Sequence, residues 1–208
     1  MKLTIDPKLI KGFLDPQEGE ALYHYGTECS SIGPLLEIGS YCGKSALYMG
    51  LAAKENNQLL YSIDHHKGSE EQQPGEEYYD PDLISESGNG INTLPFFLKT
   101  IKIAELEDSV VPIISSSKEA AQNWTKSLSM VFIDGGHSKE DAVADYKNWH
   151  TKILPGGILA IHDVFPDPND GGRAPFEIYC LAIDSGNFQE LPMVKTLGLL
   201  KKKINLKV

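Results

Sequence analysis

A polar residue closes each of five apolar runs in this chain. These residues are Glu37 with Gly39, Asp64, Ser115 to Ser117, Asp134, and His162 with Asp163. In α/β folds the carboxyl ends of parallel strands meet at one edge of the sheet, and ligands sit there. Carboxylates, hydroxyls and an imidazole from five strands are therefore expected to converge on one ligand site.

The stretch EIGSYCGKS, residues 37 to 45, predicts a tight turn between a strand and a helix. It resembles a P-loop at first sight, but Gly43, Lys44 and Ser45 would then require a glycine at position 38, where Ile38 stands. Gly39 and Gly43 still allow the backbone to approach a ligand, and the following helix directs its N–H groups toward it. NAD, ATP and S-adenosylmethionine sites share such a turn, so the turn alone leaves the ligand open.

Asp64 narrows the choice of ligand. It closes the second predicted strand about 20 residues after the glycine turn, where a carboxylate can accept hydrogen bonds from both ribose hydroxyls of an adenosine. The alternative is that Asp64 only caps the turn that follows the strand.

The remaining pattern alternates strands with helices. Helices are expected from Asp15 and over 45–54, 94–106, 117–126, 139–153 and about 175–183, and strands over 35–38, 59–64, 109–115, 129–134, 157–164, 188–194 and 196–203. The sequence LPGG, residues 154–157, is expected to close the helix before the fifth strand. The predicted fold is α/β, a doubly wound and mostly parallel sheet of about seven strands with an N-terminal helical segment.

Residues 65–93 interrupt this alternation. They are acidic and rich in turn-forming residues, and they are too many for a simple connection. We expect one domain over residues 1–208 with a long loop insertion at about 65–93. Whether the insertion covers a substrate as a lid or is disordered is left open.

Charge and hydropathy exclude two classes of partner. The net charge is −10, and the one basic cluster is the KKK at 201–203, so a nucleic-acid partner is not expected. No apolar run approaches the roughly 18 residues of a membrane span, and the first residues lack a secretory signal pattern. A cytoplasmic protein with no membrane partner is expected, and a homodimer through the closing strands is left open.

Four stretches in the same order resemble a known family: LLEIGSYCGKSALYM, IDHH, FIDGGHSKED and LPGGILAIHDV. Together they are similar to class I S-adenosylmethionine-dependent methyltransferases, and most of all to small-molecule O-methyltransferases related to catechol O-methyltransferase. The resemblance covers roughly residues 30 to 165. It implies a Rossmann-like methyltransferase fold, S-adenosylmethionine as cofactor, and a small hydroxylated molecule as methyl acceptor.

The resemblance also assigns a cofactor site. It places Glu37, Gly39, Ser40, Tyr41, Gly43 and Ser45 around the methionine end of the cofactor. Asp64 would bind the ribose, with His65 beside it. Ser116 and Ser117 would lie near the adenine, and Asp134 would lie near the sulfonium. An acidic wall suits a cationic methyl donor, whereas Glu37 would repel a nucleotide polyphosphate.

Catalytic and metal roles follow from the same resemblance. Relatives carry a lysine base three residues after the aspartate of the fourth strand, and His137 stands at that position here. A histidine titrates near neutrality and can serve as the base, or it only caps the next helix. Relatives also bind a divalent metal there, and Asp134, His162 and Asp163 are the corresponding set. The histidine departs from the all-oxygen pattern, which favours Mn²⁺, Fe²⁺ or Zn²⁺ over Mg²⁺.

Other functions stay open at this point. A module that binds the cofactor without turnover would carry the same cofactor residues. A P-loop-like NTPase is suggested by GKS and by MVFID, but the missing glycine and Asp64 count against it. An NAD-dependent enzyme is disfavoured because the turn has no Gly-x-Gly. The identity of the acceptor cannot be derived from the sequence.

Overall fold

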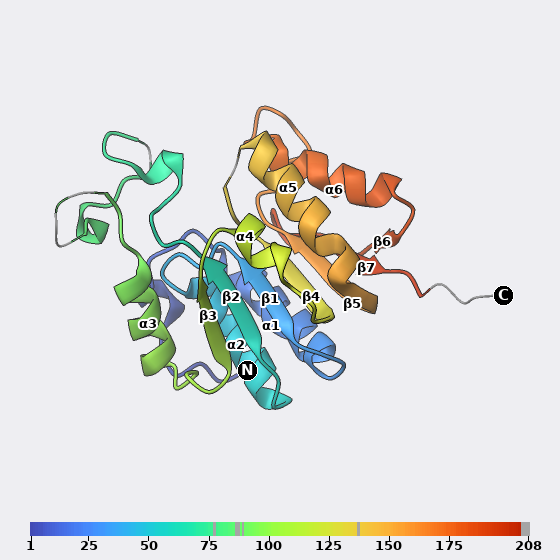
Figure 1. The fold of residues 1–208 in the computed structure, drawn as a ribbon, viewed down its shortest axis with the longest axis horizontal. Coiled ribbons are helices and arrows are strands. Elements are labelled where there is room, and N and C mark those ends of the chain that lie inside the picture. Colours follow the sequence, from blue (N-terminus) through green and yellow to red (C-terminus); the bar gives the residue numbers. More distant parts are fainter. Residues whose placement is uncertain (77, 86–87, 89, 137, 205–208) are drawn as a thin grey trace.

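The computed structural model describes residues 1–204 except 77, 86, 87, 89 and 137. Its centre is a seven-stranded sheet with the order β3-β2-β1-β4-β5-β7-β6 (Figure 1). The strands are β1 (Leu35–Ile38), β2 (Leu60–Asp64), β3 (Val110–Ile114), β4 (Leu128–Ile133), β5 (Ile153–Ile161), β6 (Phe188–Glu190) and β7 (Gly198–Lys202). The predicted α/β class and strand number are confirmed.

The order of the strands explains how residues distant in sequence meet. Strands β1 to β5 pair in parallel, and β7 runs antiparallel to both β5 and β6. The chain moves outward from β1 to β3 and then returns to β4 beside β1. The carboxyl ends of β1 and β4 are therefore adjacent at the point where the order reverses, which is where open α/β sheets bind ligands.

Six α-helices within the described residues lie on the two faces of the sheet. They are α1 (Pro16–Ser30), α2 (Lys44–Glu55), α3 (Leu94–Ile103), α4 (Ser117–Gln122), α5 (Lys139–Trp149) and α6 (Ala174–Asp184). Helix α1 begins as its sequence predicts: Asp15 accepts a hydrogen bond from the N–H of Gln17, Pro16 occupies the first turn, and Glu18 completes a capping box. Ser116 and Ser138 cap α4 and α5.

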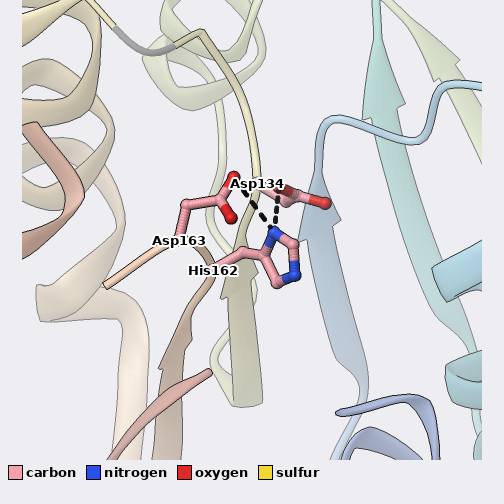
Figure 2. Close-up of side chains that lie close together, drawn as sticks. All are labelled: Asp134, His162 and Asp163. Carbon is pink, nitrogen blue, oxygen red and sulfur yellow. Dashed lines mark ion pairs between the residues drawn. The ribbon is translucent and has the colours of Figure 1, made fainter. Parts of the chain in front are cut away.

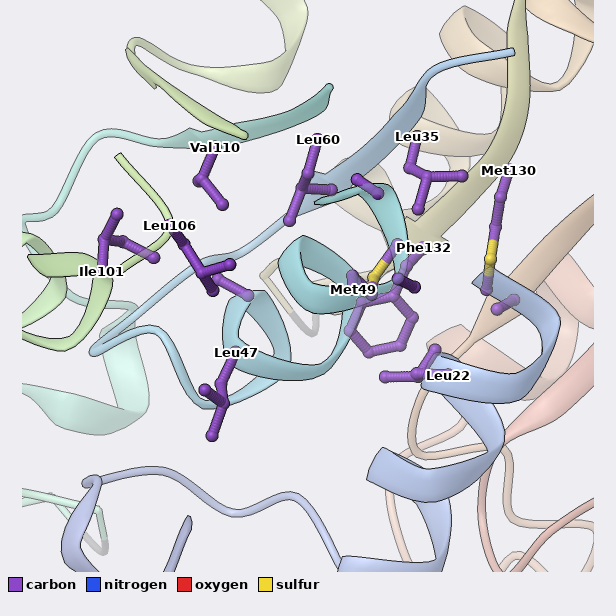
Figure 3. Packing of buried hydrophobic residues seen from close by; sticks show 14 of the residues in the cluster. Leu22, Leu35, Leu47, Met49, Leu60, Ile101, Leu106, Val110, Met130 and Phe132 are labelled. Atoms are coloured by element: carbon purple, nitrogen blue, oxygen red, sulfur yellow. The ribbon is translucent and has the colours of Figure 1, made fainter. Parts of the chain in front are cut away.

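Two hydrophobic clusters hold the helices to the sheet. One buries residues of α1, α2 and α3, among them Leu22, Met49 and Ile101, against one face (Figure 3). The other buries residues of α5 and α6, including Trp149 and Ile178, against the opposite face. Strand β1 shows the alternation between faces, since Leu35 belongs to the first cluster and Leu36 to the second.

Strand β5 differs from its prediction. The sequence LPGG was expected to close a helix, but β5 already begins at Ile153 and runs through these residues. Helix α5 ends at Trp149, and a single 3-10 turn, His150–Lys152, leads directly into the strand. Leu128 pairs with Ile153 and Met130 pairs with Ile158, so the register of β5 on β4 shifts across residues 154–157. Gly156 has φ 82°, and the LPGG sequence therefore forms an irregularity within the strand rather than a helix terminator.

The insertion at 65–93 is anchored at both ends. At its base, the N–H of Thr93 donates to the carbonyl of His66 at 3.1 Å, and the Thr93 hydroxyl lies 2.7 Å from Nδ1 of that ring. Farther out, Leu83 is buried in the core, and Ile84 pairs with Ile91 in a short bridge. Where this predicted irregular segment is described, it includes the 3-10 turns Glu70–Gln72 and Pro81–Leu83.

Within the described part of the chain, none of the helices combines the length and the apolar character needed to span a bilayer.

Candidate active site

A cavity of about 970 Å³ opens at the carboxyl ends of the parallel strands. The structure brings most of the predicted site residues into its wall. They are Gly39, Ser40, Tyr41, Ser45, Asp64, His65, Ser116, Ser117, Asp134, His162 and Asp163. Its volume is at the upper end of the range for small-molecule sites. His137 lies outside the described residues, while its neighbours Gly136 and Ser138 line the cavity.

The glycine turn after β1 forms the floor beside Asp134. Gly39 has φ 90°, and a Cβ there would lie 1.9 Å from the carbonyl oxygen of Asp134. Tyr41 also has a positive φ, 46°, and its N–H donates to Asp64 Oδ2 at 2.8 Å. Only a glycine permits this approach of two backbones, because the Asp134 carbonyl occupies the space that a side chain would need.

Asp64 both caps a turn and faces the cavity. Its Oδ2 accepts from the N–H of Tyr41, and its Oδ1 accepts from the N–H of His66 at 2.7 Å. The turn-capping alternative is therefore realised, yet each oxygen keeps a second acceptor site for a ligand hydroxyl. His65 is half-exposed at the rim, and its Nδ1 accepts from the N–H of Lys67 at 3.0 Å.

Glu37 lies behind the cavity wall rather than in it. Its side chain is fully buried, and its carboxylate accepts hydrogen bonds from the hydroxyl of Ser45 at 2.8 Å and from that of Ser62. Burial disfavours the charged form and raises the pKa of Glu37 to about 7, although the two serine hydroxyls oppose this shift. Gly43 also stands outside the wall, as the left-handed N-cap of α2. Glu37 therefore affects the site by holding the Ser45 hydroxyl, and Gly43 by starting the helix that carries Ser45.

The predicted adenine side contains an acidic residue that sequence analysis missed. Ser116 caps α4, and Ser117 accepts a hydrogen bond from Nε1 of Trp149 at 2.8 Å. Asp145, on α5, lines the same region of the cavity and also contacts Ser117. Burial raises its pKa to about 6, against a hydrogen bond from Ser117. The signal available in the sequence was the position of Asp145 on the predicted helix, one turn before Trp149 and on the same face.

Figure 2 shows the cluster formed by Asp134, His162 and Asp163 at the ends of β4 and β5. Nδ1 of His162 lies 3.1 Å from Asp134 Oδ1 and 3.3 Å from Asp163 Oδ2. Asp163 has φ 55°, a left-handed conformation that turns the chain sharply after the strand. The imidazole is buried, with 5% of the side chain exposed.

A third carboxylate, that of Glu18 on α1, holds the other side of the imidazole. Glu18 Oε2 lies 2.9 Å from Nε2 of His162, and both groups are buried. Burial opposes a charge on His162, but the carboxylates of Asp134, Asp163 and Glu18 outweigh it and hold the pKa of the imidazole well above its ordinary value. Glu18 was not among the site residues predicted from the sequence, where its one distinguishing feature was its place in the capping box of α1.

The cluster fits a divalent cation. One ligand atom from each of Asp134, His162 and Asp163 lies within 4.8 Å of the others. Nδ1 of His162 is buried and has no hydrogen bond of good geometry among the described residues, although two carboxylates surround it. A buried polar atom without a hydrogen bond calls for an explanation. Two oxygens and one imidazole nitrogen are a donor set that Mn²⁺, Fe²⁺ or Zn²⁺ accepts.

The mouth of the cavity is covered by the segment before α1. Lys11, Gly12, Phe13 and Leu14 line it. The Phe13 ring lies 5.0 Å from that of Tyr78 and 6.1 Å from that of Tyr41. Nζ of Lys44, the lysine of the GKS sequence, donates to the carbonyl of Gly12 at 2.5 Å. Lys44 thus holds the covering segment, which is not the role of a P-loop lysine.

Comparison with known proteins identifies the fold and the family. The family described as "Methyltransferase domain" matches residues 36–164, from β1 to just beyond β5. The S-adenosylhomocysteine-bound methyltransferase PaMTH1 from Podospora anserina has a TM-score of 0.66 at 15% identity, covering 92% of this chain and 80% of that chain.

Two O-methyltransferases share the fold at similarly low identity. TomG from Streptomyces achromogenes, involved in tomaymycin synthesis and solved with S-adenosylmethionine, has a TM-score of 0.64 at 14% identity, covering 92% of this chain and 82% of that chain. An enzyme from Bacillus cereus in complex with S-adenosylhomocysteine has a TM-score of 0.62 at 15% identity, covering 94% and 85%. The chain belongs to the methyltransferase domain family and has the fold of class I S-adenosylmethionine-dependent methyltransferases.

Proposed function

We propose that this protein transfers a methyl group from S-adenosylmethionine to an oxygen of a small hydroxylated acceptor. The observation that carries the proposal is the single cavity that joins a glycine turn and Asp64 at one side to the Asp134, His162 and Asp163 cluster at the other. The glycine turn and Asp64 suit an adenosine cofactor, whereas the cluster suits an acceptor whose acidic hydroxyl must lose its proton.

The cofactor would lie along the carboxyl ends of β1 to β4. Gly39, Ser40, Tyr41 and Ser45 would surround its methionine part, Asp64 would accept the ribose hydroxyls, and His65 would lie at the rim. Glu37 would act indirectly by holding the Ser45 hydroxyl, and Gly43 would act by starting α2, the helix that carries Ser45. Ser116, Ser117 and Asp145 would meet the adenine. PaMTH1, TomG and the Bacillus cereus enzyme, which have this fold, were solved with S-adenosylmethionine or S-adenosylhomocysteine.

The cofactor supplies an electrophilic methyl group on a sulfonium, and this chain must position the acceptor oxygen in line with it. Asp134 would stand nearest to the sulfonium. His137 would take the proton of the acceptor hydroxyl, since an imidazole can hold that proton near neutral pH. Asp134, His162 and Asp163 would hold a divalent cation, which lowers the pKa of a hydroxyl bound to it.

The acceptor would enter under the segment Lys11 to Leu14. Phe13, Tyr41 and Tyr78 place aromatic rings at this entrance, and such rings favour a flat, partly apolar acceptor. The net charge of −10 opposes a polyanionic acceptor such as RNA. A small molecule is therefore the acceptor class we propose.

The main alternative is a module that binds the cofactor without transferring its methyl group. Calorimetric titration of metal-stripped protein with S-adenosylhomocysteine tests cofactor binding, and Asp64→Ala should weaken it by about 10-fold or more, since hydrogen bonds to a charged group are worth roughly 1.5–3 kcal/mol. Asp108→Ala, an exposed acidic position, is the control.

Turnover is tested separately with radiolabelled S-adenosylmethionine and a panel of catechols, phenols and aliphatic alcohols, with and without Mn²⁺. Methylation of one class, lost in His137→Ala, is the expected result. Tight cofactor binding without methylation of any acceptor would favour the non-catalytic alternative, and absence of binding would overturn the proposal.

A further inference from the structure

Glu18 has an unusual set of hydrogen bonds for a residue in the first turn of a helix. Its Oε2 accepts from the N–H of Asp15 at 3.1 Å and lies 2.9 Å from Nε2 of His162. Its Oε1 accepts from the N–H of Thr196 at 2.9 Å and from the Thr196 hydroxyl at 2.7 Å. The residue is 2% exposed. Three donors and the His162 ring, from three separate segments, thus converge on one buried carboxylate.

This arrangement determines which nitrogen of His162 carries a proton. Two of the donors are backbone N–H groups, one on each oxygen, and they cannot reverse their direction. These hydrogen bonds, with that from the Thr196 hydroxyl, favour the ionised carboxylate, which acts only as an acceptor, so Nε2 of His162 is the donor in their contact. The ring is consequently oriented with Nδ1 toward Asp134 and Asp163, and Nδ1 is the nitrogen that a cation between these carboxylates would bind in place of a proton.

We propose that Glu18 is a positioning residue for a divalent cation at Asp134, His162 and Asp163. The inference rests on the proposed function and deepens it, because it says which atom fixes the nitrogen ligand. A carboxylate on the far nitrogen of a metal-binding histidine fixes its tautomer and orientation and raises its basicity. Glu18 would act on the cation through His162, without touching it.

A purely structural role is the competing explanation. The same carboxylate connects α1 to the end of β5 and to the turn between β6 and β7, and loss of such a connection alone would loosen the fold. The two roles differ in what else changes. Loosening would weaken the cofactor site along with the metal site, whereas loss of positioning would weaken the metal site alone.

Glu18→Gln separates these roles. Glutamine has the same shape but no charge, and one of its two terminal atoms is a donor. In one orientation of the amide, its NH₂ group faces the N–H of Thr196. In the other orientation, it faces the N–H of Asp15 and Nε2 of His162. Thr196→Val is the matched control, because it removes one hydrogen bond from the same carboxylate on the side away from His162. Glu18→Asp, which keeps the charge but shortens its reach, is a second variant should the glutamine fail to fold.

The experiment measures Mn²⁺ affinity of the metal-stripped protein by electron paramagnetic resonance, and S-adenosylhomocysteine affinity by calorimetry. Glu18→Gln is expected to weaken Mn²⁺ binding by about 10- to 100-fold, as is typical when the residue behind a metal ligand is lost, and Glu18→Asp should weaken it as well. Thr196→Val should change Mn²⁺ affinity less than about 3-fold, and cofactor affinity should be retained in each variant.

Three results would overturn the positioning role: unchanged Mn²⁺ affinity in Glu18→Gln and Glu18→Asp, equal losses in Glu18→Gln and Thr196→Val, or an unmodified protein that binds S-adenosylhomocysteine but no Mn²⁺. A protein that gave the expected Mn²⁺ pattern without binding S-adenosylhomocysteine would support the role of Glu18 and would overturn the proposed methyltransferase activity instead.

Discussion

Gly39 and Asp134 are in backbone contact across the point where the strand order reverses. A Cβ on Gly39 would meet the Asp134 carbonyl oxygen at 1.9 Å, and the N–H of Asp134 donates to the carbonyl of Ile38 at 2.9 Å. The turn that would cradle the cofactor and the residue nearest the proposed reaction centre therefore cannot move independently.

Gly39→Ala should damage both stability and cofactor binding. An alanine must adopt a left-handed conformation, which costs about 1–2 kcal/mol, and must also push β4 away from β1. We expect a loss of at least about 2 kcal/mol in the free energy of unfolding by urea, and S-adenosylhomocysteine binding too weak to titrate. Gly172→Ala is the control, since a Cβ there meets nothing within 4 Å. Normal cofactor binding by Gly39→Ala would contradict this account of the turn.

Glu37 should make the stability of the cofactor-free protein depend on pH. Its pKa rises from 4.5 to about 7 on burial, so the folded state binds a proton more tightly than the unfolded chain. Stability is therefore unaffected below about pH 4.5 and falls as pH rises to about 7, by about 3 kcal/mol over the window.

The variant Glu37→Gln removes this titration. Its free energy of unfolding, measured relative to that of the unmodified protein by urea titration, should increase between pH 5 and pH 8. The exposed residue Glu140 provides the control, because Glu140→Gln should show no such trend. A difference between Glu37→Gln and the unmodified protein that stays constant with pH would exclude Glu37 as the titrating group.

Mn²⁺ should raise the melting temperature of the metal-stripped protein, since a ligand of the folded state alone stabilises it by about 2.7 kcal/mol at 100 times its Kd. Asp163→Asn should reduce this rise, because asparagine tolerates the left-handed conformation at φ 55° but removes one of the charges facing the cation. Asp167→Asn, the same change four residues later, should behave as the unmodified protein. Equal melting shifts in both variants would argue against the cluster as the binding site.

Lys11 should control how fast the cofactor leaves. Its Nζ bonds to Asp82 Oδ2 at 2.9 Å and also contacts Asp80, so it connects the segment over the cavity mouth to the insertion at 65–93. Lys11→Met should change global stability by less than about 1 kcal/mol, because partly exposed ion pairs contribute little. It should nevertheless increase the stopped-flow dissociation rate of S-adenosylhomocysteine several-fold, with Lys8→Met as control. An unchanged rate would mean that this segment does not retain the ligand.

The position of the strand-end residues at one edge of the sheet could be predicted because it depends on local order. Successive parallel units with helical connections bring each strand's end to one edge, so Asp64, Asp134 and Asp163 needed only correct strand assignments. Glu37 shows the limit of this reasoning. It occupies the predicted strand, but like Leu35, two residues earlier, it points to the face covered by α1, α2 and α3, where Ser45 and Ser62 enclose it.

Residues whose role depends on packing between distant segments could not be predicted. Glu18 meets His162 only because α1 packs beside the end of β5, and no periodicity in the sequence encodes that docking. Likewise, Gly156 and Gly157 are turn-forming residues in most contexts, yet they lie within β5, where the register of this strand on β4 shifts. Local propensity was overridden by the sheet in that case.

The contacts of Glu18 also bear on how the protein acquires its site during synthesis. Its partners lie 144 and 178 residues later in the chain, at His162 and Thr196. A growing chain that has already synthesised β1 to β4 and the glycine turn still lacks both partners of Glu18. These contacts can be completed only after Thr196, in the turn before β7, has been synthesised, so the connection is one of the last that the chain can form.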